Sequence, residues 1–290
     1  MKKIFAIVLC FLLVNAPFAS AGDNATLTSL LKPEFSPLIC APDVELLILV
    51  KSAVANRILR ETLRSFWFNE TLWKPLRVKL VFVLGISSDI ALQLETTYET
   101  ASYKDIIQGR FIDSYRNNTL KMMFSFNLAK NFCKSANFVL FLDDDYCLNP
   151  AALLKELSEL RKLPSKRFIL GHIWSCSKPA RDPHSKWYIE EAVFSSEYYP
   201  EYPGAGAFIV PRSLINPIYS EMLRTPIIFM DDVFLGLVMR KLIIYPLKTN
   251  LIHSGPIYAL NSSLLPQYIA FHGCRHFMQH QAFRHSISNQ

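Results

Sequence analysis

Two apolar segments separated by a helical pattern constrain the fold of this chain more than any other feature. Residues 45–50 and 78–84 are dominated by Leu, Ile, Val and Phe, which is typical of buried strands. Residues 56–67, between them, have the spacing of an amphipathic helix. A strand, a helix and a second strand at this spacing predict a parallel sheet and therefore an α/β fold.

The rest of the chain continues this alternation. With 290 residues, of which 51% are hydrophobic, the chain can bury the core of one large α/β domain. Proline and aromatic residues are frequent in 175–203, so we expect a long irregular segment there. We expect further helices at 90–103, 119–133, 150–162, 213–223 and 231–240, and further strands at 138–142 and 167–173.

The N-terminus has the pattern of a secretory signal. Lys2 and Lys3 precede an apolar run, 4–14, and the small residues 19–21 follow, which predicts cleavage after Ala21. A spanning helix needs roughly 20 apolar residues, and this run is about half as long, so an uncleaved signal anchor is the alternative. We therefore divide the chain into a signal at 1–21, a short stem at 22–43 and one folded domain at 44–290.

Glycosylation sequons and cysteines agree with a lumenal location. The asparagines of the four sequons are Asn24, Asn69, Asn117 and Asn261. Outside the signal there are five cysteines, and an oxidising lumen favours disulfides between them. Because five is odd, we expect one thiol to be free or paired between chains; the sequence does not give the connectivity.

The net charge argues against a nucleic-acid partner. The formal charge is +7, and it falls to +5 when Lys2 and Lys3 are removed with the signal. No block of Lys and Arg is dense enough to indicate nucleic-acid binding. A modest positive charge is compatible with a small, negatively charged substrate.

Three consecutive carboxylates, Asp143, Asp144 and Asp145, follow the predicted strand 138–142. Ligands of parallel α/β sheets bind beyond the carboxyl ends of the strands, which is where these residues fall. Adjacent carboxylates repel one another unless a cation compensates them, and oxygen ligands suit Mg²⁺ or Mn²⁺. The pattern therefore predicts a metal site, with a solvated turn that caps the next helix as the alternative.

A second acidic pair, Asp231 and Asp232, lies among apolar residues at a predicted helix start. The helix dipole favours one acid at this position. Two acids in an apolar setting indicate that at least one is partly desolvated, as a general base often is. A metal site and a separate base in a lumenal α/β protein are what transfer from a nucleotide-activated donor requires.

Six stretches carry recognisable motifs, at 50–67, 103–123, 142–149, 185–189, 199–210 and 231–236. In wording and order they resemble the motifs of glycosyltransferase family 31, the β-1,3-hexosyltransferases. The wording "LFLDDDY" and "SKWY" is closest to brainiac-like and invertebrate members. One departure is Phe141, where the family commonly has a lysine two residues before the aspartate triplet. The matching stretches are "VKSAVANRILRETLRSFW" (50–67), "YKDIIQGRFIDSYRNNTLKMM" (103–123), "LDDDYCLN" (142–149), "SKWYI" (185–189), "YPEYPGAGAFIV" (199–210) and "DDVFLG" (231–236).

The resemblance implies a GT-A fold, in which a Rossmann-like nucleotide-binding half with a mostly parallel sheet is joined to an acceptor half. It also implies a UDP-sugar donor, Mn²⁺ or Mg²⁺, inversion by direct displacement, a glycan acceptor on protein or lipid, and a Golgi type II membrane location, with secretion as the alternative. The sugar, whether galactose or an N-acetylhexosamine, and the acceptor glycan stay open.

Matching positions suggest roles for individual residues. By resemblance Asp145 binds the metal, Asp143 contacts the ribose or a metal-bound water, and Asp144 shapes the donor pocket. Asp232 corresponds to the proposed base, with Asp231 as its positioning neighbour. His272 corresponds to a late histidine that completes the metal shell, with His253 as its competitor and a plain surface residue as the alternative.

Supporting roles are expected for residues on both sides of the site. Arg60 and Arg64, one helical turn apart, are predicted to face the diphosphate, or else to form a solvated helix face. Lys121 is expected near the donor, or as an exposed helix lysine. The acceptor-side residues are Trp187 and Tyr188, as a sugar platform or as core, and Gly204 and Gly206, as a close approach or as a plain turn.

Two other classes of protein are compatible with the acidic motifs. A metal-dependent phosphohydrolase can also use paired aspartates and histidines, but it would not explain the acceptor-side motifs. An inactive secreted lectin or chaperone of the same fold is the other alternative, although a binding protein has no need of a base.

Overall fold

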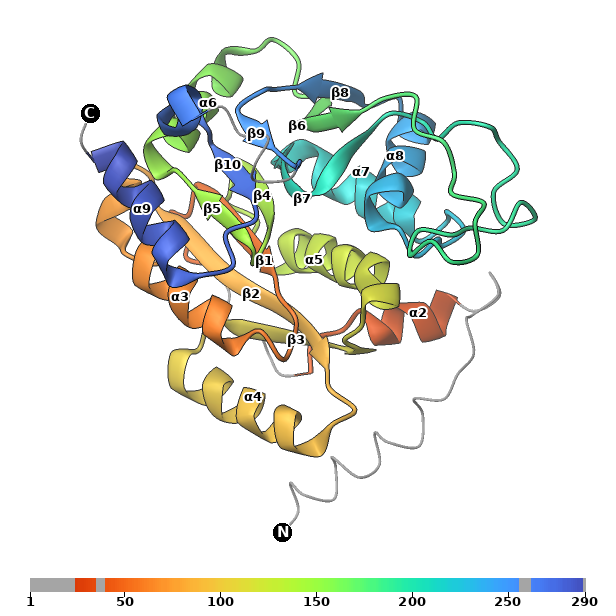
Figure 1. The fold of residues 1–290 in the computed structure, drawn as a ribbon, viewed down its shortest axis with the longest axis horizontal. Helices are drawn as coiled ribbons and strands as arrows, with labels where there is room; N and C mark the ends of the chain where they lie inside the picture. The colour runs from red at the N-terminus through yellow and green to blue at the C-terminus, as the bar shows by residue number, and fades with distance from the viewer. Residues whose placement is uncertain (1–23, 35–39, 256–261, 289–290) are drawn as a thin grey trace.

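A central sheet of seven strands runs through the molecule in the order β3-β2-β1-β4-β7-β6-β8 (Figure 1). The strands β3, β2, β1 and β4 are parallel, whereas β7 is antiparallel to both of its neighbours. A smaller sheet has the order β5-β10-β9. The strands are β1 (Leu46–Lys51), β2 (Val78–Ile86), β3 (Ile106–Ile112), β4 (Phe138–Asp143), β5 (Tyr146–Leu148), β6 (Phe168–Trp174), β7 (Tyr202–Pro211), β8 (Tyr245–Lys248), β9 (Ile252–His253) and β10 (Ala270–His272).

The computed structural model describes residues 24–34, 40–255 and 262–288. The predicted signal, with its alternative of a signal anchor, lies outside these ranges. Within them, no helix is both long and apolar enough to cross a membrane.

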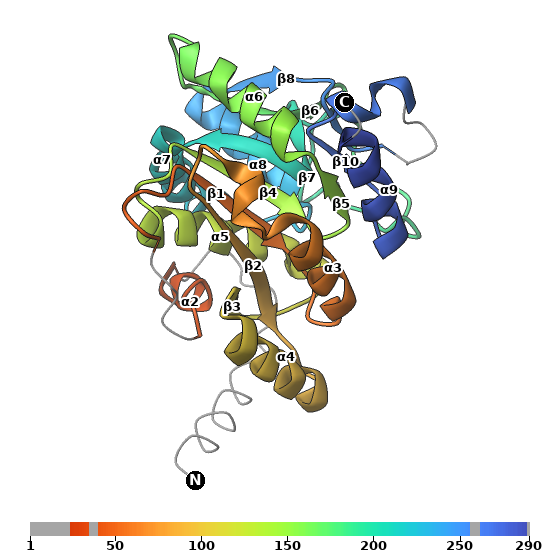
Figure 2. The same ribbon diagram turned by 90° about the vertical axis from the view of Figure 1, so that its left-hand side faces the viewer.

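Helices cover both faces of the large sheet, as Figures 1 and 2 show from two directions. On one face α5, α7 and α8 pack over the odd-numbered side chains of β1 and β4, such as Leu49 and Phe141. On the other face α3, α6 and α9 pack over the even-numbered ones, such as Ile48 and Leu140. The helices are α2 (Asn24–Leu30), α3 (Arg57–Trp67), α4 (Ile90–Tyr103), α5 (Asn118–Phe132), α6 (Pro150–Lys162), α7 (Arg212–Met222), α8 (Asp231–Leu242) and α9 (Phe277–Ser288), with short 3-10 turns η2 (Glu70–Trp73), η3 (Tyr115–Asn117) and η5 (Ser262–Gln267).

The strands β1 and β4 read as continuous apolar runs because both of their faces are buried between these helix layers. Asn149 caps α6 by accepting a hydrogen bond from the Ala152 amide at 3.2 Å, and Pro150 occupies the first turn. The predicted α/β class with a mostly parallel sheet is therefore confirmed.

Sheet register brings the functional motifs to one edge of the sheet. In the parallel pair, Lys51 at the end of β1 lies beside Asp143 at the end of β4. Because β7 runs the other way, its amino end lies at this same edge, with Ala207 opposite Leu142. The predicted irregular segment ends where β7 begins, and neither β7 nor β3 was expected from periodicity.

The structure describes residues 24–34 and 40–43 of the predicted stem, 22–43. Its described part packs on the domain: Leu31 is fully buried, and its carbonyl oxygen accepts a hydrogen bond from Asn127 Nδ2 at 2.7 Å. A disulfide also joins Cys40 to Cys133, which follows α5. The folded unit therefore includes α2 and begins before residue 44.

The five cysteines outside the predicted signal give two disulfides and one exposed thiol in the described residues. The second disulfide joins Cys147 on β5 to Cys274 just after β10, and the free thiol is Cys176. The expectation of one unpaired cysteine is met.

The sequons differ in accessibility. Asn69 is exposed, which suits a glycosylated residue. The Asn117 amide instead donates to the Ile112 carbonyl at 2.9 Å, and the buried Thr119 hydroxyl donates to the Ile228 carbonyl at 2.6 Å. Because both polar groups of this sequon are engaged in the fold, Asn117 is poorly placed for modification of the folded chain. The side chain of Asn24, and all of Asn261, lie outside the described part.

Candidate active site

A pocket of about 310 Å³ opens at the sheet edge where β1, β4 and β7 meet. It brings together both acidic motifs, the late histidine and the acceptor-side segment, which are far apart in the sequence. Its lining consists of Tyr115, Asn118, Asp143, Tyr146, Trp174, Lys186, Trp187, Gly204, Ala205, Gly206, Phe229, Met230, Asp231, Asp232, Ser254 and His272.

A buried lysine joins the two acidic motifs. The Nζ atom of Lys51 lies 3.0 Å from Asp143 Oδ1 and 2.8 Å from Asp231 Oδ2, and its side chain is 6% exposed. Burial opposes the charged form, but these two carboxylates hold the pKa of Lys51 above its ordinary value. Phe141, two residues before the triplet, stacks on Phe208, and the cation that contacts Asp143 is Lys51 on the neighbouring strand.

The acids Asp231 and Asp232 have different environments although they are adjacent. Asp231 is tied to Lys51, whereas we find no ion pair of Asp232 within the described ranges; its Oδ1 accepts a hydrogen bond from the Val233 amide at 2.8 Å. Burial, reinforced by the charge of Asp231, raises the pKa of Asp232 to about 7. Burial raises the pKa of Asp143 as well, to about 6, but Asp143 is paired with Lys51. Asp232 therefore combines a pKa close to neutral pH with the absence of an ion pair in the described ranges.

One carboxylate oxygen of Asp145 contacts two side chains, one at the end of β10 and one just after it. His272 Nε2 lies 3.2 Å from Asp145 Oδ2, and an Nη atom of Arg275 lies 3.1 Å from the same oxygen. Burial acts to raise the pKa of Asp145, but the hydrogen bond and charge of His272, together with Arg275, hold that pKa below its usual range. The same hydrogen bond raises the pKa of His272.

The donor types of these residues suit a divalent cation. Asp143 and Asp145 supply carboxylate oxygens and His272 supplies an imidazole nitrogen, which are donor types that Mn²⁺ accepts. The guanidinium of Arg275 on Asp145 and the ammonium of Lys51 on Asp143 show that this cluster attracts positive charge. His253, the competing histidine, does not line the pocket; its ring lies 6.1 Å from that of Tyr268.

The middle aspartate of the triplet is an anchor of the β1 and β4 ends. Asp144 is 7% exposed, and its Oδ2 accepts hydrogen bonds from Ser52 Oγ at 2.6 Å and Asn56 Nδ2 at 3.0 Å. It joins the loop after β4 to the loop that leads into α3. It supports the loops around the site and does not line the pocket.

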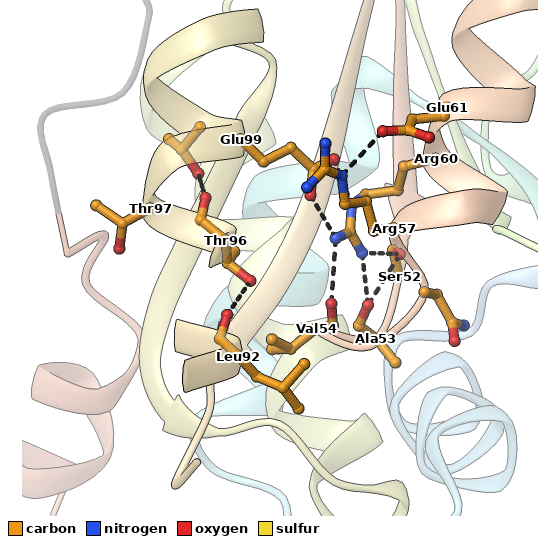
Figure 3. A network of polar contacts seen from close by, with 12 residues as sticks. Ser52, Ala53, Val54, Arg57, Arg60, Glu61, Leu92, Thr96, Thr97 and Glu99 are labelled. Carbon is orange, nitrogen blue, oxygen red and sulfur yellow. Dashed lines mark hydrogen bonds and ion pairs between the residues drawn. The ribbon is translucent and has the colours of Figure 1, made fainter. Parts of the chain in front are cut away.

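The prediction that Arg60 and Arg64 face a diphosphate is wrong. Figure 3 shows the Arg60 guanidinium enclosed by Glu99 and the backbone carbonyls of Ala53 and Val54, and this side chain is fully buried. Arg64 is 9% exposed and pairs with Glu99 and with Asp105 at 2.8 Å. The alternative of a solvated helix face is also wrong, because both arginines hold α3 against α4 and the start of β3.

Lys121 is neither an exposed helix lysine nor part of the pocket lining. It is 4% exposed, and its Nζ donates to the Ser52 carbonyl at 2.7 Å and to Asp113 Oδ1 at 2.9 Å. Asp113 in turn accepts a hydrogen bond from the Gly85 amide at 2.7 Å. Lys121 therefore fixes the loops that follow β1 and β3 at the edge of the site.

Of the four residues predicted on the acceptor side, three line the pocket and one lies outside its lining. Trp187 is 52% exposed and lines the pocket, whereas Tyr188 is half-buried outside the lining. Gly204 and Gly206 are pocket residues on β7. A Cβ atom at Gly206 would lie 2.4 Å from the Tyr146 ring, so the glycine is required for this close approach.

Several residues of the site were not predicted from the sequence. Lys51 and Arg275 each contact a member of the aspartate triplet, while Tyr146 and Trp174 line the pocket. Lys51 carried one usable signal, since it directly follows five apolar residues at the end of a buried strand. Arg275 carried none beyond its proximity to His272 in the sequence.

Comparison with known proteins gives a consistent result. The family model described as Galactosyltransferase matches residues 59–250. The chain is 34% identical over 197 residues to "Beta-1,3-galactosyltransferase brn" of Drosophila melanogaster, a match covering 68% of this chain and 60% of the relative. It is also 34% identical over 214 residues to the "Lactosylceramide 1,3-N-acetyl-beta-D-glucosaminyltransferase" of Mus musculus, covering 71% of this chain and 57% of the relative. The chain thus spans little more than half the length of these relatives.

Among solved structures, apo mouse xyloside xylosyltransferase 1 superposes with a TM-score of 0.39 and 13% sequence identity, covering 80% of this chain and 97% of that one. A likeness this distant does not define the fold. The sheet topology and the family match do so instead.

Proposed function

Because the chain belongs to the galactosyltransferase family, we propose that it is an inverting β-1,3-hexosyltransferase that moves galactose or an N-acetylhexosamine from a UDP-sugar to a glycan acceptor. The observation that carries this proposal is that a candidate base and candidate metal ligands lie in one pocket. A carboxylate without an ion pair in the described part of the chain, Asp232, lies in the same pocket as Asp143 and His272, beside Asp145.

In the proposed reaction Asp232 accepts the proton of the acceptor hydroxyl as its oxygen attacks the anomeric carbon of the donor. The new glycosidic bond forms as the bond from that carbon to the diphosphate breaks, and UDP leaves. Lys51 pairs with both Asp143 and Asp231, so the carboxylate of Asp231 is engaged in an ion pair of the fold. Trp187 offers an exposed ring on which an acceptor sugar can stack.

The residues that would hold Mn²⁺ or Mg²⁺ are Asp145, Asp143 and His272. Such an ion would supply positive charge for the departing diphosphate. A location in the secretory pathway, in the Golgi lumen or membrane with secretion as the alternative, is also proposed. The N-terminal pattern and the two disulfides support this location.

Product analysis with a panel of substrates tests the function. The purified protein is incubated with Mn²⁺, each of UDP-galactose, UDP-N-acetylglucosamine and UDP-N-acetylgalactosamine, and a set of simple acceptor glycosides. We expect one donor to give a β-1,3-linked product by mass spectrometry and NMR, with UDP release that requires the acceptor. Asp232→Asn is the matched control and should form product at least about 100-fold more slowly.

The same experiment separates the alternatives. Phosphate release without an acceptor would indicate a phosphohydrolase. Retention of acceptor glycosides on the protein, with no transfer from any donor, would indicate an inactive lectin.

A further inference from the structure

A diphosphate requires positive charge, and the cations expected to provide it are engaged elsewhere. Lys51, Lys121, Arg60 and Arg64 have side chains that are 9% exposed or less, and each forms an ion pair with a carboxylate of the fold. Moving any of them onto a ligand would break an ion pair that the fold uses. These four residues therefore shape the site and are not free to bind the donor.

Arg275 differs from these residues in exposure and in the number of its contacts. Its side chain is 64% exposed, and an Nη atom lies 3.1 Å from Asp145 Oδ2. In the described part of the chain, Asp145 is the only hydrogen-bond acceptor that we find for its guanidinium group. A guanidinium has five N–H donors, so most of them are available to a ligand.

The backbone under Arg275 is fixed beside the aspartate triplet. The amides of Gly273 and Cys274 donate to the Asp145 carbonyl oxygen at 3.0 and 2.8 Å, and Cys274 is covalently bonded to Cys147. The Arg275 amide also donates to Gln279 Oε1 at 2.7 Å. The side chain can therefore turn while its Cα atom stays next to Asp145.

Two other exposed cations near the pocket lie over aromatic rings of its lining. Lys186 lies over the Trp187 ring at 4.4 Å, and Arg116 lies over the Phe229 ring at 4.2 Å. Arg275, by contrast, shares an oxygen atom with His272 on the side of the triplet. Of these exposed cations, it is the one that contacts a residue of the proposed metal site.

We propose that Arg275 binds the diphosphate of the donor, and that its contact with Asp145 is exchanged for the phosphate oxygens when the donor enters. This inference rests on the proposed function. A planar guanidinium matches two phosphate oxygens at once, whereas its contact with Asp145 uses one carboxylate oxygen. The exchange also frees Asp145 Oδ2 for the cation that accompanies the donor.

Binding of UDP and of uridine to the intact protein tests the proposal. With Mn²⁺ present, Arg275→Gln should weaken UDP binding in calorimetry about 10- to 100-fold, because a charge-assisted contact is lost. Uridine lacks phosphate and should bind both proteins equally in ligand-observed NMR. Mn²⁺ alone, followed by electron paramagnetic resonance, should bind the variant at least as tightly, since Asp145 loses a competing cation. Arg275→Lys should recover part of the UDP affinity.

Arg77→Gln is the matched control. Arg77 is 66% exposed and lies 3.0 Å from Asp43, so it is an arginine of similar exposure in a similar ion pair, and its loss should leave UDP affinity unchanged. Equal UDP affinity of wild type and Arg275→Gln would overturn this inference but not the proposed function. Equal losses of UDP and uridine would show a structural role and would also overturn it. No UDP binding by the wild type would overturn the proposed function, and this inference with it.

Discussion

The ammonium group of Lys51 lies 2.8 Å from a carboxylate oxygen of Asp231, although 180 residues separate the two along the chain. Lys51 ends β1 and Asp231 begins α8, so one buried ion pair joins the sheet edge to the helix that carries the proposed base. Asp143 completes the arrangement from β4.

Replacing Lys51 by methionine should destabilise the protein strongly. Methionine fills similar space but leaves the carboxylates of Asp143 and Asp231 without their counter-charge. We expect the free energy of unfolding to fall by about 3 kcal/mol or more. Urea denaturation at pH 7 measures it, with Lys155→Met, on the exposed side of α6, as a control that should shift stability by no more than about 0.5 kcal/mol. Equal stability of the two variants would show that Lys51 is not needed as a counter-charge.

Substituting the two neighbouring acids separately should separate their roles. Asp232→Asn keeps the shape of the side chain but cannot accept the acceptor proton, so turnover should fall about 100-fold or more with UDP binding retained. Asp231→Asn should reduce turnover less, since it removes the partner of Lys51 and not the base. Steady-state kinetics and calorimetry on proteins shown to be folded by circular dichroism measure both effects. If Asp231→Asn is the less active enzyme, the assigned roles are reversed.

The raised pKa of Asp232 predicts a pH dependence. A general base acts as the carboxylate, and burial together with Asp231 raises the pKa of Asp232 to about 7. We expect kcat/KM, which reports the free enzyme, to increase as pH rises through about 7 and then to level off. A profile that is flat between pH 5.5 and 8 would argue against a base with this pKa.

Loss of the Asp145 carboxylate should remove metal-dependent nucleotide binding. The contacts that hold the surrounding loop use the Asp145 carbonyl oxygen, so Asp145→Ala should stay folded. We expect UDP affinity in Mn²⁺ to fall to the level seen in chelator. Asp43→Ala, which removes an exposed acid paired with Arg77, is the control and should bind UDP normally. Unchanged metal-dependent affinity of Asp145→Ala would exclude this residue as a ligand.

Local sequence predicted the central strands and the placement of acids at their ends. The apolar runs of β1, β2 and β4 are long enough to be recognised as strands, and Asp143 follows such a run directly. Strand β7 was missed as a strand, and its direction cannot be read from its residues, because an alternating or apolar pattern is the same in a parallel or antiparallel strand. Its insertion between β4 and β6 depends on tertiary pairing.

Side-chain roles were predictable only where the partner was near in the sequence or carried by a motif. The spacing of Arg60 and Arg64 correctly indicated a shared helix face, but Glu99 on α4 decides that this face is buried. The burial of Lys51 is explained by Asp143 on β4 and Asp231 on α8, both far along the chain. Charge pairs across elements are therefore the part of the site that required the structure.

His280 on α9 is a fully buried histidine next to the second disulfide. Trp67 Nε1 donates a hydrogen bond to its Nδ1 at 3.3 Å, and its Nε2 lies 3.1 Å from the Cys274 carbonyl oxygen. A neutral ring with its proton on Nε2 satisfies both contacts, whereas a proton on Nδ1 would break the first. Burial accordingly lowers the pKa of His280 to about 4.

This environment predicts a loss of stability in acid. The unfolded chain protonates His280 near its ordinary pKa of about 6.5, and the folded chain does so only near 4, so the unfolded state binds more protons between these values. The stabilisation is thus complete above pH 6.5, and about 3 kcal/mol of it is lost as pH falls toward 4. His280→Gln keeps an amide donor for the Cys274 carbonyl but has no group that titrates. We therefore expect the difference in unfolding free energy between wild type and variant to shrink by about that amount between pH 7 and pH 4, measured by urea denaturation. A difference that stays constant across this range would mean that His280 titrates alike in both states, and that Trp67 and Cys274 do not hold it neutral.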